Sequence, residues 1–192
     1  DADGFSLMQG IGGSFSVGDQ NSFSYGYSFS DSKNNKNSTD TTANETNAKG
    51  HGLSLGHDYV FNEIISSSTG LGYSTSEAKV GTNDFETYDL NFRLNFALPL
   101  GYISVGNGLS FNDYKNVDTS INSNRIRSDV TNTFDLMFTK AIGDFFPTID
   151  PDKSLFISFS YEKIFSEANI INYDYISDSF AVSLSKSFHL NK

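Results

Sequence analysis

The chain has 192 residues, enough for one domain of ordinary size, and a formal net charge of −10 at pH 7. This charge argues against nucleic-acid binding, which needs clustered Lys and Arg residues. The sequence has no cysteine, which excludes a disulfide framework and thiol chemistry, and no apolar run long enough for a membrane-spanning helix.

The composition is unusual for a soluble domain. Phe occurs 18 times and Tyr 10 times, Trp is absent, and charged residues make up only 19%. A soluble protein of this kind would have to cover its surface with Ser, Gly and Asn. The mean hydropathy of −0.35 looks soluble, but a transmembrane β-barrel can have the same average because its polar interior offsets its apolar exterior.

Alternation of large apolar residues with small or polar ones recurs along nearly the whole chain and predicts β-strands. The clearest case is YDLNFRLNFAL at 88–98, where Leu90 and Phe92 alternate with Asp89 and Asn91. The predicted stripes lie at 23–29, 53–61, 65–75, 88–98, 103–111, 126–142, 155–165 and 180–190.

Long polar connections alternate with short turns between these stripes. Residues 31–50 and 112–125 form long links, whereas Pro99 to Gly101 forms a tight turn. This alternation is typical of bacterial outer-membrane barrels. It predicts an all-β fold, a closed antiparallel up-and-down transmembrane β-barrel over residues 22–192, with eight strands and ten as the alternative.

Residues 1–21 are assigned to a periplasmic tail, a plug or an additional strand. The segment lacks the basic and apolar regions of a secretion signal, so an exported protein would be represented by its mature form.

The two faces of the strands leave two interpretations open. In a soluble lipocalin-like barrel or a β-sandwich, the apolar residues would point inward, and rows of Ser, Gly and Asn would meet water. An eight-stranded barrel is too narrow to hold so many large residues, although a sandwich could. The favoured interpretation turns the apolar residues outward as a belt for lipid.

The repeated stripes, the loop alternation and the ending SFAVSLSKSFHLNK resemble the small eight-stranded bacterial outer-membrane barrels of the OmpA-, OmpX- and OmpW-like class. The ending departs from the usual assembly signal, because Phe188 is followed by four further residues. The resemblance implies a location in the bacterial outer membrane, contact with lipopolysaccharide, and folding by the outer-membrane assembly machinery.

Charged residues on the interior side form the first candidate site. We expect Arg93 to contact Asp135, Asp58 or both, because a guanidinium in a narrow interior needs carboxylate partners. Such a cluster would close the interior or select what passes through it. Its candidate members are Arg93, Asp135, Asp58, Asp89, Glu162, Arg127 and Asp129.

Polar residues that interrupt the apolar stripe form the second candidate site. His57, Asn107 and Asn132 are assigned to an oligomer or partner face, with tolerated interruptions of the stripe as the alternative. No Ser/His/acid trio converges and no metal-ligand spacing is present, so we expect no catalysis, metal or cofactor.

The expected function is that of an integral outer-membrane protein with a structural or surface role. An extracellular ligand would bind through the loops 31–50 and 112–125. The alternative is a narrow channel for small solutes or ions through a Ser/Gly-lined interior. A lipid-modifying enzyme and a soluble sandwich rank below these.

Overall fold

The computed structural model describes residues 3–35, 47–78, 84–117, 124–170 and 173–187. Within them the chain folds into one antiparallel β-sheet, with a 3-10 turn, η3 (Ile142–Asp144), between two of its strands. The strands are β1 (Asp3–Val17), β2 (Asn21–Asn35), β3 (Ala48–Val60), β4 (Ile65–Ala78), β5 (Phe85–Leu98), β6 (Gly101–Val117), β7 (Ile126–Ala141), β8 (Leu155–Ala168) and β9 (Tyr175–Lys186).

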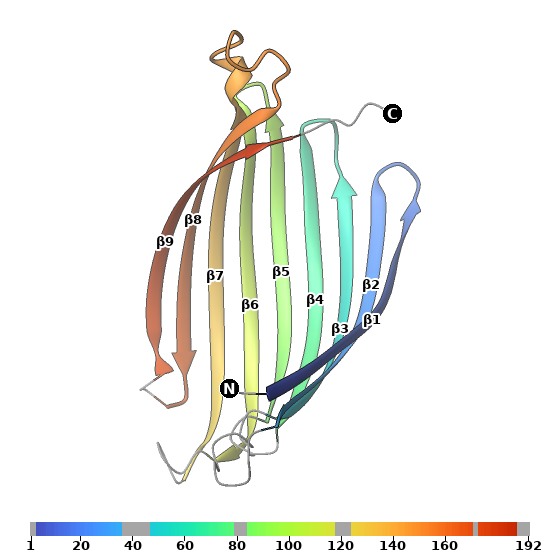
Figure 1. The fold of residues 1–192 in the computed structure, drawn as a ribbon, viewed down its shortest axis with the longest axis vertical. Helices are drawn as coiled ribbons and strands as arrows, with labels where there is room; N and C mark the ends of the chain where they lie inside the picture. Colours follow the sequence, from blue (N-terminus) through green and yellow to red (C-terminus); the bar gives the residue numbers. More distant parts are fainter. Residues whose placement is uncertain (1–2, 36–46, 79–83, 118–123, 171–172, 188–192) are drawn as a thin grey trace.

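The strands follow one another in chain order across the sheet, and each pairs antiparallel with the next. Figure 1 shows a long curved band with β1 and β9 at its opposite edges. No described residues of β1 and β9 pair with each other, so the sheet is open.

The prediction of a closed barrel with eight or ten strands is therefore wrong. Residues 3–17 pair with β2 along their whole length, from Asp3 opposite Asn35 to Val17 opposite Asn21, and so add a ninth strand. An odd number of alternating strands leaves the first and last running in the same direction. These two strands therefore cannot meet in the antiparallel arrangement that joins all the others.

The sheet has two chemically different faces, because side chains alternate along each strand. The apolar face carries rows such as Leu90 and Phe92, and the polar face carries Asp89, Asn91 and Arg93. Large apolar side chains remain exposed, up to 84% for Phe180. The described residues thus form one layer, and nothing in them packs against the apolar face.

The hairpin of β5 and β6 shows how the turn residues set the register. The strands pair from Phe85 opposite Tyr114 to Leu98 opposite Gly101. Gly101 has a φ of +142°, and a Cβ there would lie only 2.7 Å from the carbonyl oxygen of Thr139. Glycine is required at this turn because any other residue would be both strained and crowded.

Connections between strands gather at two ends of the sheet. The turn end holds residues 18–20, 61–64, 99–100 and 142–154. At the opposite, loop end lie the described residues that flank the two predicted long links. Parts of 31–50 and 112–125 belong to β2, β3 and β6, whereas 36–46 and 118–123 lie outside the described residues.

The connection 142–154 at the turn end is organised around Asp150, which is 5% exposed. Its carboxylate accepts hydrogen bonds from the amides of Gly143, Ser154 and Leu155, at 3.2, 2.9 and 3.0 Å. Burial alone would raise the pKa of Asp150, but these hydrogen bonds outweigh it and hold the pKa below its usual value. The connection is therefore ordered by an ionised side chain.

Candidate polar groove

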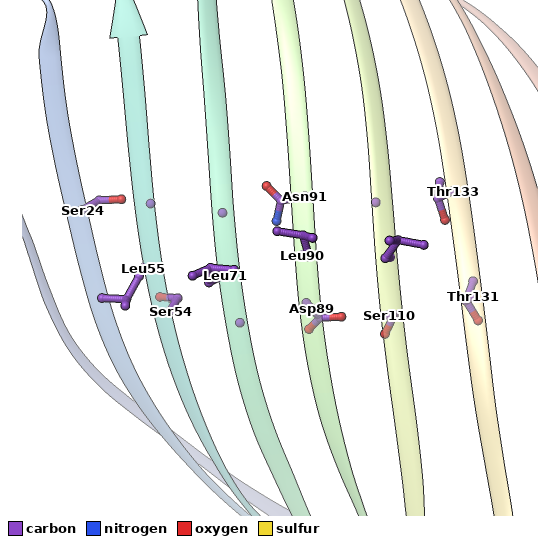
Figure 2. Close-up of a pocket in the computed structure, with 15 residues that line it drawn as sticks. Ser24, Ser54, Leu55, Leu71, Asp89, Leu90, Asn91, Ser110, Thr131 and Thr133 are labelled. Atoms are coloured by element: carbon purple, nitrogen blue, oxygen red, sulfur yellow. The ribbon is translucent and has the colours of Figure 1, made fainter.

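A groove of about 480 Å³ lies on the polar face and crosses the sheet from β2 to β7. Figure 2 shows Ser24, Ser54, Asp89, Ser110 and Thr131, which line the groove, spread across the sheet from β2 to β7. Since one hollow is lined by residues of so many strands, the sheet curves toward its polar face.

Small residues on this face let polar side chains lie flat across neighbouring strands. A Cβ added to Gly70 would lie 2.6 Å from Asn91 Oδ1, and one added to Gly72 would lie 3.2 Å from Asp89 Cβ. The same relation joins Gly106 to Asp135. Each of these polar side chains occupies the space that a Cβ on the adjacent strand would need. The side chains therefore lie along the sheet surface and do not project into the groove.

Arg93 and Asp135 form an ion pair just beyond the groove residues Asn91 and Thr133 on the same face. Arg93 Nη2 donates to Asp135 Oδ1 at 2.8 Å, and Nη1 donates to Ser104 Oγ at 3.0 Å. Ser104, which is 1% exposed, in turn donates to Asn95 Oδ1 at 2.9 Å. The pair joins β5 to β7 above Gly106, which lies between them in register.

Four residues of the predicted charged cluster share one row across the sheet. The register places Asp58 on β3, Arg93 on β5, Asp135 on β7 and Glu162 on β8 in that row. Among the described residues, Arg93 forms an ion pair with Asp135 but not with Asp58 or Glu162. The structure thus brings two of these four side chains into contact and aligns the others with them.

Arg127 and Asp129 form a second, separate pair nearer the loop end of β7. Arg127 Nε donates to Asp129 Oδ1 at 2.9 Å, and Asp129 is 4% exposed. The guanidinium lies 3.4 Å from the ring centroid of Tyr173 and 4.6 Å from that of Tyr114. The predicted single cluster is therefore two clusters, about 20 Å apart along β7 at the rise of a β-strand. Asp89 lies on β5 in the groove between them.

The three polar residues predicted on the apolar face, His57, Asn107 and Asn132, lie in two separate places. Asn107 Nδ2 donates to Asn132 Oδ1 at 2.9 Å across β6 and β7. His57 lies on β3, where its Nε2 and Asn21 Oδ1 are 3.0 Å apart and its ring stacks on Phe23 at 4.6 Å. Local hydrogen bonds engage all three side chains, which do not form one contiguous patch.

No protein family model matches the chain, and no curated protein sequence is detectably similar to it. In the described parts of the chain, no group of three or more His, Asp or Glu residues could hold a metal ion. No helix in those parts has the length and apolar character needed to cross a membrane. Functional interpretation therefore depends on the two faces of the sheet.

Proposed function

We propose that this protein is an integral component of the bacterial outer membrane, in which the apolar face of the sheet contacts lipid. Its role is structural or that of a surface for partner contact, through the connections at the loop end. The proposal includes neighbouring lipopolysaccharide and insertion by the outer-membrane assembly machinery. It includes no catalysis and no cofactor.

The observation that carries this proposal is the continuous, exposed apolar face. Ile11 on β1, Leu55 on β3 and Phe180 on β9 are 74, 60 and 84% exposed, so apolar side chains are uncovered from one edge to the other. Soluble monomers rarely expose a patch of more than a few hundred Å². Lipid would cover this face without a second protein layer.

A second candidate function is passage of small solutes or ions along the polar face, and the groove favours it. The small side chains between the Arg93–Asp135 and Arg127–Asp129 pairs leave a water-accessible trough. Single-channel recording tests this function. A conductance that changes in Arg93→Ala would support it, and a silent bilayer would overturn it.

Fluorescence quenching by lipids with brominated acyl chains tests the main proposal, because the chain contains no Trp and Trp emission therefore comes from the introduced probe alone. Phe111→Trp places the probe on the apolar face, where Phe111 is 42% exposed. Ser110→Trp, one residue away on β6, places it in the groove.

We expect brominated lipid to quench the Phe111→Trp variant strongly and the Ser110→Trp variant weakly. The two probes share a strand and nearly the same depth, so a difference between them reports which face meets the acyl chains. Equal quenching of both variants, or a Phe111→Trp variant that lipid does not quench, would overturn the proposal.

A further inference from the structure

The outer edge of β9 is a long row of backbone groups that no described strand covers. Ser187 N–H donates to Ser154 O at 2.8 Å, which shows that odd-numbered residues direct their amides toward β8. Successive amides of a strand point to opposite sides. The amides of Ile176, Asp178, Phe180 and Val182 therefore point away from β8, at the edge of the sheet.

This edge lacks the features that usually prevent strand addition. Natural sheet edges are protected by proline, bulges, short length or inward charges. β9 has 12 residues, contains no proline, and pairs with β8 without a register shift. The carboxylate of Asp178 is engaged by Tyr161 at 2.6 Å and Lys163 at 3.2 Å, so its charge is compensated within the sheet.

We propose that the edge of β9 binds a further β-strand in antiparallel orientation. This inference rests on the lipid-facing role proposed above, because a lipid environment offers no water to satisfy open backbone groups. The partner strand alternates apolar residues with small polar ones. Its apolar side chains lie beside Phe180, Val182 and Leu184, and its small polar ones beside Ala181 and Ser183.

The direction of the strands determines which polypeptide can supply the partner strand. β1 and β9 run in the same direction, as do the β1 and β9 strands of any second copy inserted the same way. Either would meet β9 in parallel, whereas every pairing in the sheet is antiparallel. The partner is therefore a strand from another polypeptide segment, running in the direction of β8.

A synthetic peptide with the sequence of Leu155–Ala168 is a suitable probe, because this segment already pairs antiparallel with β9. It presents a Lys to Asp178 and a Tyr to Phe180 in the register of the native pair. The control peptide has the same residues in an order without alternation. Backbone amide hydrogen exchange is measured on the full chain in detergent micelles.

We expect the probe peptide, but not the control, to slow exchange at Phe180 and Val182 by about tenfold, the factor that one net hydrogen bond confers. Amides of odd-numbered residues, which already bond to β8, stay unchanged. Unaltered exchange at the even-numbered amides, or equal protection by the control peptide, would overturn the inference.

Two proline variants distinguish loss of peptide binding at the edge from loss of stability of the sheet. Val182→Pro removes an outward amide and should abolish peptide protection while leaving stability nearly unchanged. Ala181→Pro removes a bond to β8 and should destabilise the sheet. Disulfide-linked dimers of Val182→Cys without peptide would show that a second copy occupies the edge and would overturn the inference.

The two proposals fail in distinguishable ways. The peptide experiment contains no bilayer, so an edge that does not bind the peptide overturns the strand-addition inference and leaves the quenching result intact. Absent quenching of the Phe111→Trp variant, together with a peptide-binding edge, would instead overturn the membrane role alone.

Discussion

Gly106 is the position at which one added methyl group should break the Arg93–Asp135 pair. A Cβ at Gly106 would overlap the Asp135 carboxylate, which cannot move aside without leaving Arg93. Gly108, two residues along the same face, is the matched control, because the nearest atom to its added Cβ is Thr133 Cβ at 4.0 Å. Both substitutions remove the same backbone freedom of glycine.

The expected difference follows from the environment of the ion pair. The side chains of Arg93 and Asp135 are 41 and 25% exposed, so solvent screens the pair in part. Its contribution lies between the values for exposed pairs and for charged hydrogen bonds, about 1–1.5 kcal/mol. Gly106→Ala should therefore be about 1–1.5 kcal/mol less stable than Gly108→Ala, which should match or exceed the parent protein.

Equilibrium unfolding in urea, with the protein in lipid vesicles, measures these differences. Repeating both substitutions in an Asp135→Ala background completes a double-mutant cycle. The penalty at Gly106 should then vanish, because the carboxylate that the methyl group displaces is gone. Equal stability of the two alanine variants, or a penalty that persists without Asp135, would refute the reasoning.

Three further outcomes are expected. Because the folded-state pKa of Asp150 is lowered, its stabilisation is present above the unfolded pKa of about 3.9 and is lost as the pH falls through the folded value; urea titrations should show a weaker acid dependence in Asp150→Asn. Replacing Asn107 alone by Leu should cost about 0.5–1 kcal/mol by leaving the Asn132 amide unpaired on the apolar face, and adding Asn132→Leu should recover it; additive losses would contradict this. Gly101→Ala should destabilise by about 1–3 kcal/mol through its positive φ and its approach to Thr139, and an unchanged unfolding midpoint would argue against the strain.

The antiparallel up-and-down arrangement could be predicted from the alternation in the sequence, because side-chain parity fixes the face of each residue once a strand is recognised. The number of strands could not. The first 21 residues show alternation, but Gly12 and Gly13 weaken it. The pairing of residues 3–17 with β2 made the strand count odd. Whether the two edge strands could close the sheet with an antiparallel pair depends on that count, which no local pattern contains.

The candidate site, too, could be predicted from the sequence only in part. Parity placed Arg93 and Asp135 on one face, and the need of a guanidinium for carboxylates made their contact predictable. The passage of Arg93 over Gly106 depends on the register between β5, β6 and β7, which the sequence does not state. A signal was present in the glycines at alternate positions of β6, Gly106 and Gly108, because they mark where side chains of neighbouring strands can cross.

The single-layer sheet makes the protein a nearly one-dimensional system. In the described residues, backbone ladders join each strand only to the strands before and after it, as interfaces join repeats in a solenoid, so stability accumulates from one hairpin to the next. Loss of order can begin at β1 or β9 and travel inward, whereas β5 and β6 are held from both sides. A strand bound at the edge would thus convert a terminal unit into an internal one and raise the cooperativity of the whole sheet.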